Sequence, residues 1–308
     1  MRYRRSVYRK RRIKIIAISA AVAAVVLSLL FVIVGNMLAG KTDGGEEDSG
    51  NGTSGAPTDD RTPLRDVRAY PVPLSADGST LSGRLSSATR NGYSDVCFYM
   101  DTDSGALWYV SDVAKKLGRQ TDAGSELRTL SNIVGLFDSN SVYSIGITHI
   151  HDMRNDDGLL RAASSGFYAA QIAEALLAGV DDVLILAGDL PAERYGELIS
   201  LADEIHRLSG KGNVGLALPV SLISSSENAA LVEELYSAFD YLAADLSVSD
   251  GETDEAERIN ASISSDLHYY VLRYSMRVLI PNTDDGATAE AINSVLDNRN
   301  IKNVQIMP

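Results

Sequence analysis

The sequence predicts an α/β fold in which residues 64–308 form a (β/α)₈ barrel. Short apolar runs alternate with longer amphipathic ones along this part of the chain, which is the pattern of βαβ units in a parallel sheet. Two runs, DVLILAG at residues 182–188 and VGLALPV at residues 214–220, are apolar at nearly every position, as expected for strands covered on both faces. The alternative is an open doubly wound sheet. The chain matches GxxxxGKT at residues 35–42 and GxGxxG at residues 50–55 and 210–215, but none of these segments follows a predicted strand and opens a predicted helix. A nucleotide-binding version of that sheet is therefore disfavoured.

Eight strands and seven helices are predicted, and the barrel ends on its eighth strand. The predicted strands span residues 67–72, 95–101, 142–151, 182–187, 213–220, 241–246, 268–274 and 303–307, with the seventh open to extension as far as residue 280. The predicted helices span residues 79–91, 124–139, 165–178, 192–209, 227–239, 252–265 and 287–298. In the third of these helices, Phe167, Ile172 and Leu176 belong to one apolar stripe, and Gly179 is a natural stop.

The first 38 residues predict a membrane anchor. Residues 1–14 hold eight cations and no acid: Arg2, Arg4, Arg5, Arg9, Lys10, Arg11, Arg12 and Lys14. Residues 15–34 contain no charged residue, and a helix of about 20 residues spans the roughly 30 Å of a bilayer core. We therefore expect a transmembrane helix at residues 15–38 that contacts the lipid bilayer, with the basic tail in the cytoplasm and the rest outside. A cleaved signal peptide is the alternative, although Met37, Leu38 and Ala39 match its cleavage site poorly.

Residues 39–63 predict a flexible linker, because they are rich in Gly, Ser, Thr and acids and have little to bury. The chain after Lys14 has 20 of the 28 Lys and Arg against all 41 Asp and Glu, which gives it a formal charge of about −21 (20 minus 41). Such an acidic domain repels nucleic acid, so neutral polysaccharide or a cell-envelope protein is the expected partner. Cys97 is the only cysteine, which excludes an internal disulfide and a cysteine-rich metal site.

Three segments carry a resemblance to a known family. They are VCFYMDTDSGALWYVS at residues 96–111, VYSIGITHIHD at residues 142–152 and FYAAQIAEALLAGVDDVLILAGDLP at residues 167–191. They resemble successive blocks of a bacterial family of glycoside hydrolase-like TIM-barrel proteins, a domain of unknown function. The matching residues are Asp103, Gly105, Tyr109, Ser111, Tyr143, Asp152, Gly179, Asp181 and Pro191. The resemblance implies a barrel fold and a carbohydrate-related function.

The departures from the family fall on its polar positions. In an alignment without gaps, the acidic position of the fourth strand becomes Leu186, and the arginine just beyond it becomes Asp189. The acid of the second strand falls on Tyr99, and the arginine of the third falls on or beside Gly146. The resemblance therefore implies a barrel that is degenerate at the active site and serves as a glycan- or envelope-binding module. The alternative is an active glycoside hydrolase on cell-envelope or extracellular polysaccharide.

Candidate catalytic residues follow from the rule that barrel sites lie at the C-terminal ends of the strands. Glycoside hydrolysis needs two carboxylates, roughly 5–5.5 Å apart for retention or 6.5–9.5 Å for inversion. Asp189 is the expected acid, and Asp101 or Asp245 the expected base or nucleophile. Each of these aspartates has an alternative role as the cap of a helix or turn.

Candidate binding residues lie in the same regions: Asp103, Trp108, Tyr109, His149, His151 and Asp152. Trp108, Tyr109 and Tyr99 are of a type that stacks on sugar rings, with burial in the core as the alternative. His149 and His151 point to the same face of a strand and could share a metal. Because His206 falls in a predicted helix and His268 at the start of a predicted strand, further ligands are missing, and neither a metal nor a cofactor is expected.

Overall fold

The structure is a computed structural model. It describes residues 66–74, 78–102, 105–116, 129–150, 162–187, 190, 194–248, 254–283 and 285–308. All of these belong to one compact unit, Thr62–Pro308. The predicted tail (1–14), transmembrane helix (15–38) and linker (39–63) lie outside the described residues. Among the helices that are described, none combines the length and the apolar character needed to cross a bilayer.

Eight parallel strands close into a barrel in the order of the sequence, from β1 next to β2 around to β8 next to β1. The strands are β1 Arg68–Pro71, β2 Asp95–Tyr99, β3 Tyr143–His149, β4 Asp182–Leu186, β5 Asn213–Pro219, β6 Tyr241–Asp245, β7 Arg277–Ile280 and β8 Val304–Ile306. Closure is visible in the register of β1, where Ala69 pairs with Asp95 on one side and with Gln305 on the other. The (β/α)₈ architecture is thus confirmed.

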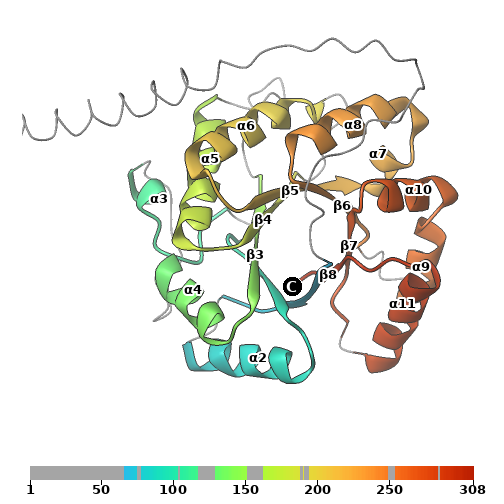
Figure 1. Ribbon diagram of the computed structural model, residues 1–308, viewed down its shortest axis with the longest axis horizontal. Helices are drawn as coiled ribbons and strands as arrows, with labels where there is room; N and C mark the ends of the chain where they lie inside the picture. The colour runs from blue at the N-terminus through green and yellow to red at the C-terminus, as the bar shows by residue number, and fades with distance from the viewer. Residues whose placement is uncertain are drawn as a thin grey trace, which may run out of the picture. The chain divides into compact units, whose positions relative to one another are not determined.

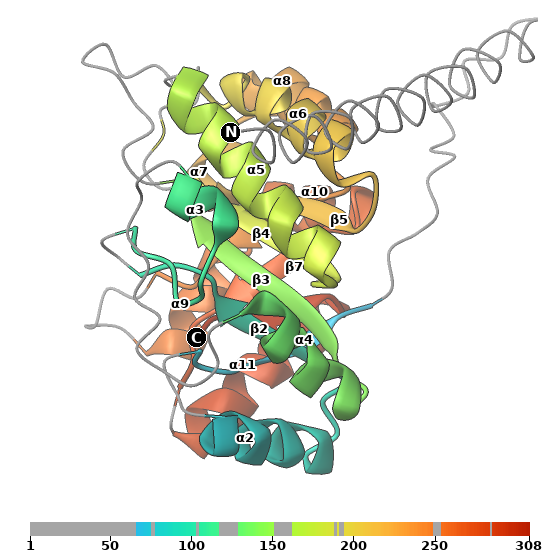
Figure 2. The same cartoon turned by 90° about the vertical axis from the view of Figure 1, so that its left-hand side faces the viewer.

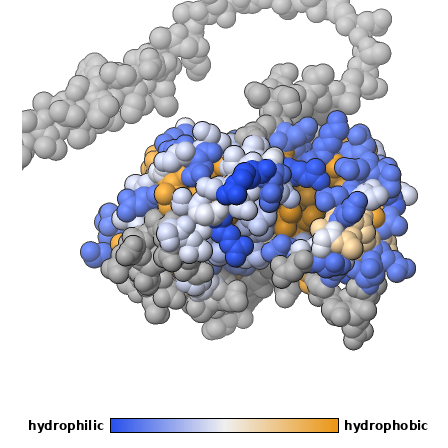
Figure 3. Space-filling model, turned by 90° about the horizontal axis from the view of Figure 1, so that it is seen from below, coloured by the Kyte–Doolittle hydropathy of each residue, from blue (hydrophilic) through white to orange (hydrophobic). Residues whose placement is uncertain are grey.

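The helices lie outside the ring of strands (Figure 1). They are α2 Gly78–Arg90, α3 Asp112–Lys116, α4 Leu130–Ser139, α5 Ala162–Ala178, α6 Glu197–Ser209, α7 Val220–Ile223, the 3₁₀ helix η2 Ser226–Asn228, α8 Ala229–Ala238, α9 Glu255–Ser262, α10 Ser265–Arg273 and α11 Gly286–Asn298. In the view of Figure 2, α5 lies beside α6, and these two helices also pack against each other. The molecular face in Figure 3 is mainly hydrophilic with small hydrophobic areas between, as expected for helices that bury one side.

The predicted position of the seventh strand is wrong. Residues 268–274 are not a strand, because they belong to α10 and its C-terminal end, and β7 begins only at Arg277. The side chain of Ser264 caps α10 by accepting a hydrogen bond from the Leu267 amide. Leu267 and Val271 are the buried positions of this helix, and their spacing of four residues is helical. His268 therefore lies on a helix, where its Nε2 is 2.8 Å from the Arg299 carbonyl oxygen.

The barrel interior holds its own apolar core, separate from the larger layer between strands and helices. Its buried members are Val67, Ala69, Cys97, Ile145, Ile147, Leu184, Ala217, Tyr241, Ala243, Leu279 and Met307. Small residues here leave room for large neighbours. A Cβ at Gly215 would lie 2.1 Å from Cζ of Tyr241, so only glycine lets the tyrosine ring occupy the interior.

A charged group closes the base of the interior, at the N-terminal ends of the strands. The Arg277 guanidinium donates to a carboxylate oxygen of Asp182, and it lies 3.7 Å from the ring centroid of Tyr241. The other Asp182 oxygen accepts from Tyr143 Oη at 2.6 Å and from Asn213 Nδ2 at 2.7 Å. Burial and the negative charge of Asp182 raise the pKa of Tyr143 well above its usual value. At this end of a barrel, such a network serves stability.

Candidate functional site at the mouth of the barrel

A cavity of about 320 Å³ lies at the opposite end, where the strands finish. Its lining residues are Tyr99, His149, Leu186, Ala187, Tyr195, Ala217, Pro219, Asp245, Ser247, Val248 and Met307. Five successive strands contribute their last residue to it: Tyr99 from β2, His149 from β3, Leu186 from β4, Pro219 from β5 and Asp245 from β6. This is the end of the fold at which TIM barrels carry their functional residues.

The floor of the cavity is apolar. Ala217 and Met307 are buried members of the interior core, and Tyr99 and Leu186 pack against that core while also lining the cavity. The floor is therefore the uppermost layer of the packed barrel and is held rigidly by it.

His149 is fixed in place by Asp101, which follows β2. Asp101 Oδ1 lies 2.9 Å from His149 Nδ1, and Asp101 Oδ2 accepts from the His149 amide at 3.0 Å and from Thr148 Oγ1 at 2.6 Å. Because a carboxylate only accepts, Nδ1 carries the proton of the neutral imidazole, and Nε2 is then an acceptor. The ring of Tyr99 stacks on that of His149 with centroids 5.1 Å apart and an interplanar angle of 26°.

The Asp101 carboxylate does not line the cavity. The residue is only 3% exposed and is not among those that line the mouth. Thr148, which points to the helices, receives a further long hydrogen bond from Gln171 Nε2 of α5 at 3.4 Å. Asp101 is thus a buried support for His149, anchored by a chain of polar contacts to α5.

Asp245 places a carboxylate on the cavity wall. Its Oδ1 accepts hydrogen bonds from the amide of Ser247 at 2.9 Å and from Ser247 Oγ at 2.6 Å. This is the geometry of an Asx turn, so the capping role considered for this residue is present. Asp245 is also the one carboxylate among the described residues that line the cavity, and neither Lys nor Arg occurs in that lining.

The remaining candidate site residues are not found in the part of the cavity lining that the structure describes. Asp103, His151, Asp152 and Asp189 lie outside the described residues. Tyr109 is fully buried in the layer beneath the helices, and Trp108 is partly buried against the same layer, so neither lines the cavity. Within the described part of the chain, no three His, Cys, Asp or Glu side chains gather as a possible metal site.

The aligned family positions fall into two groups. Leu186 and Tyr99 do line the cavity. Gly146 faces outward instead: a Cβ there would lie 2.5 Å from Met100 Sδ and 3.5 Å from Val180. An arginine at Gly146 would therefore not reach the mouth.

Sequence reasoning missed Tyr195, Ser247 and Met307. Tyr195 and Met307 are indistinguishable from core residues in the sequence, and both are indeed largely buried. Ser247 could have been predicted, because a serine two residues after an aspartate at the end of a strand is the pattern of an Asx turn.

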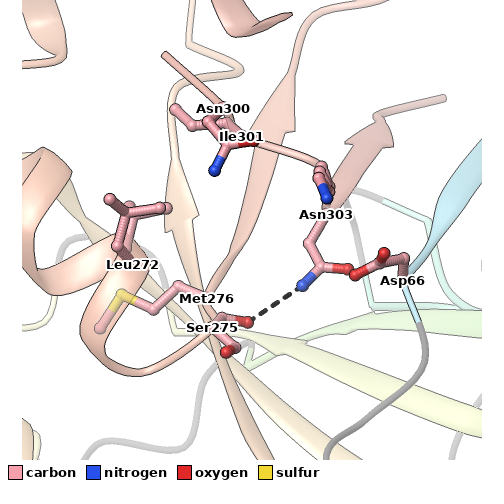
Figure 4. Close-up of a pocket in the computed structure, with 9 residues that line it drawn as sticks. Asp66, Leu272, Ser275, Met276, Asn300, Ile301 and Asn303 are labelled. Carbon is pink, nitrogen blue, oxygen red and sulfur yellow. Dashed lines mark hydrogen bonds between the residues drawn. The ribbon is translucent and has the colours of Figure 1, made fainter.

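A second cavity, of about 160 Å³, lies at the base of the barrel (Figure 4). Asn303 lines this cavity. Its Nδ2 donates to the Ser275 carbonyl at 3.3 Å, and its Oδ1 accepts from the Val67 amide at 3.0 Å. These contacts tie the start of β1 to the loop before β7. Because they stabilise the barrel at its N-terminal end, the mouth remains the candidate functional site.

No family model matches the sequence, and no curated protein matches it either. Among solved structures, the chain is similar to cellulose synthase subunit Z from Clostridioides difficile at 9% identity and a TM-score of 0.45, over 79% of this chain and 91% of that one. It is similar to endoglucanase Cel5A from Thermotoga maritima at 10% identity and a TM-score of 0.47, over 73% and 81% of the two chains. Endonuclease IV from Thermus thermophilus matches at 15% identity and a TM-score of 0.48, over 78% and 90%. These likenesses concern the fold alone.

Proposed function

We propose that this protein is a membrane-tethered, extracytoplasmic barrel that binds a saccharide at its mouth without hydrolysing it. The carrying observation is the burial of Asp101, whose carboxylate is absent from the cavity lining and is hydrogen-bonded to Thr148 and His149. A hydrolase needs two carboxylates that face the sugar from opposite sides. Among the described residues of the lining, only Asp245 offers one.

The floor of the mouth supports the same proposal. By the family resemblance, Tyr99 and Leu186 stand where acidic side chains are expected, and both line the cavity. An aromatic ring and an aliphatic side chain at these places offer a surface for the apolar face of a sugar ring in place of acid chemistry. A cavity of about 320 Å³ is at the small end of ligand sites, which suits one or two sugar units.

The tether is argued from the sequence alone. Residues 1–14 are basic, residues 15–34 are uncharged and residues 39–63 are polar and rich in glycine. This order suits a helix anchored in the cell membrane that carries the barrel on a flexible linker outside the cytoplasm. A barrel so placed would meet polysaccharide of the cell envelope.

An active glycoside hydrolase is the second candidate, and Asp245 is the observation that favours it. This carboxylate ends β6 and lines the cavity, as a catalytic acid or base would. Asp189 is the partner that the sequence offers.

The test is calorimetric titration of the full-length protein in detergent micelles with neutral β-linked oligosaccharides, together with chromatography of the sugar after prolonged incubation. The proposal predicts saturable binding and an unchanged oligosaccharide. Release of shorter sugars that disappears in Asp189→Asn or Asp245→Asn would instead establish the hydrolase. Absence of any binding would contradict both candidates.

A further inference from the structure

The charged side chain that lines the mouth of the barrel in the described part of the chain is negative. Asp245 faces the cavity, and no cationic side chain belongs to the part of the lining that the structure describes. Arg258 approaches the same end of β6 and donates to the Leu246 carbonyl at 2.8 Å, but its charge is matched by Glu255 at 2.6 Å. Arg194 is likewise paired with Glu197 at 2.8 Å. The Asp245 charge therefore has no described counterion at the cavity.

Asp245, Ser247 and His149 present mainly hydrogen-bond acceptors to the cavity, whereas the hydroxyls of Tyr99 and Tyr195 can both donate and accept. The amide and the hydroxyl of Ser247 both donate to Asp245 Oδ1, so the donors of this residue are used within the turn. His149 donates a hydrogen bond from its protonated Nδ1 to Asp101, which makes Nε2 an acceptor in the neutral ring. A ligand that supplies donors fits these groups, whereas a ligand carboxylate would meet the Asp245 carboxylate.

We propose that the mouth takes a cationic amino sugar, a hexosamine unit whose nitrogen is a free amine. The ammonium group pairs with Asp245, the sugar hydroxyls donate to acceptors of the wall, and the apolar face of the ring packs on Tyr99, Leu186 and Met307. This inference rests on the proposed function and adds the charge of the ligand to it. The apolar floor strengthens the pairing, because charges interact more strongly where water is excluded.

The experiment compares two trisaccharides that differ only at nitrogen: β-1,4-linked glucosamine and its fully N-acetylated counterpart. Each is titrated into the full-length protein in micelles at about pH 7, where a free amine is still mostly protonated. The free-amine trisaccharide is expected to bind roughly tenfold more tightly, as is usual for a hydrogen bond between charged groups. Equal affinities, or tighter binding of the acetylated form, would overturn the inference while leaving the proposed function in place.

A pair of variants separates a local from a general effect of charge. Asp245→Asn is expected to abolish the preference for the free amine. Asp203→Asn makes the same change of charge at an exposed position of α6 and is expected to keep the preference. If both variants lose it equally, the attraction comes from the whole acidic domain and the inference fails.

Two further measurements cover the remaining outcomes. Should Asp245→Asn fail to fold, the wild-type preference is measured between low and high salt, and the inference requires it to shrink as salt rises. Spermidine provides an amine without a sugar ring and is expected to bind much more weakly than the glucosamine trisaccharide. Spermidine binding of equal strength would overturn the assignment to a sugar, and binding of neither trisaccharide would overturn the proposed function as well.

Discussion

Asp101 Oδ1 lies 2.9 Å from His149 Nδ1, although the two residues are 48 positions apart in the sequence. The contact exists because β2 and β3 are neighbouring parallel strands, and their C-terminal ends meet at the mouth. It decides the roles of both residues. Asp101 supports the ring from the buried side, and His149 presents that ring to the cavity.

The first prediction concerns this support. Asp101→Asn removes an acceptor from Thr148 and His149 and leaves buried donors without a partner, so the barrel should lose about 1–3 kcal/mol of unfolding free energy. The imidazole should also lose its fixed tautomer. Denaturant unfolding measures the first effect, and the ¹⁵N shifts of the His149 ring measure the second. Asp203→Asn, on the exposed side of α6, is the control. Unchanged ring shifts would show that Asp101 does not position His149.

The second prediction concerns the packing of the interior. Gly215→Ala places a methyl group where the Tyr241 ring lies, so it should destabilise the protein by about 1–3 kcal/mol or more. Gly83→Ala is the matched control, because nothing lies within 4 Å of a Cβ at that position of α2. The control should be stabilising by about 0.5–1 kcal/mol, as alanine is the better helix former. Equal unfolding midpoints for the two variants would contradict this account of the core.

A third prediction tests the charged group at the base. Arg277→Met leaves the Asp182 carboxylate buried with its main counterion missing, which should cost about 3–5 kcal/mol. In the double variant Arg277→Met with Asp182→Leu, much of that loss should be regained, because no unpaired charge remains. Arg207→Met breaks an exposed pair with Glu204 and should leave stability nearly unchanged. The free energies come from denaturant titration, and a double variant no more stable than the single one would argue against the pair.

The fourth prediction is a dependence of stability on alkaline pH. Burial raises the pKa of the Cys97 thiol far above its usual range, and this outweighs the lowering effect of the Arg277 charge. Because the unfolded thiol ionises first, stability is complete below about pH 8.5 and falls as the pH rises above it. Cys97→Ala should remove the loss between about pH 8.5 and 10. Above that range the buried Tyr109 and Tyr241, whose pKa values burial also raises, should cause a loss in both proteins. Identical profiles for the two proteins would refute the role of Cys97.

Most strands of the barrel could be predicted from the sequence because each is marked by a short apolar run of its own. β4 and β5 read as strands from their nearly continuous apolar residues, and both were predicted to within one residue at each end. Residues 268–274 were wrongly predicted as a strand because this segment is rich in aromatic and β-branched residues, which are typical of strands: Tyr269, Tyr270, Val271 and Tyr274. Their helical state is fixed by the cap at Ser264 and by burial of Leu267 and Val271.

The mouth was predictable in position but not in detail. The strand-end rule selected His149 and Asp245, which line the cavity, and Asp101, which does not. The orientation of Asp101 depends on its contact with Thr148 and His149 across two strands, which no local pattern encodes. Tyr195 and Met307 were missed because a buried lining residue and a core residue have the same side-chain chemistry.

The most direct test of the saccharide-binding proposal is to follow the His149 ring by NMR while a β-linked oligosaccharide is added to the full-length protein. The proposal predicts that the His149 resonances shift in a saturable manner and that the sugar signals remain those of the intact oligosaccharide. His149 resonances that do not respond, or sugar signals that convert to shorter products, would contradict it.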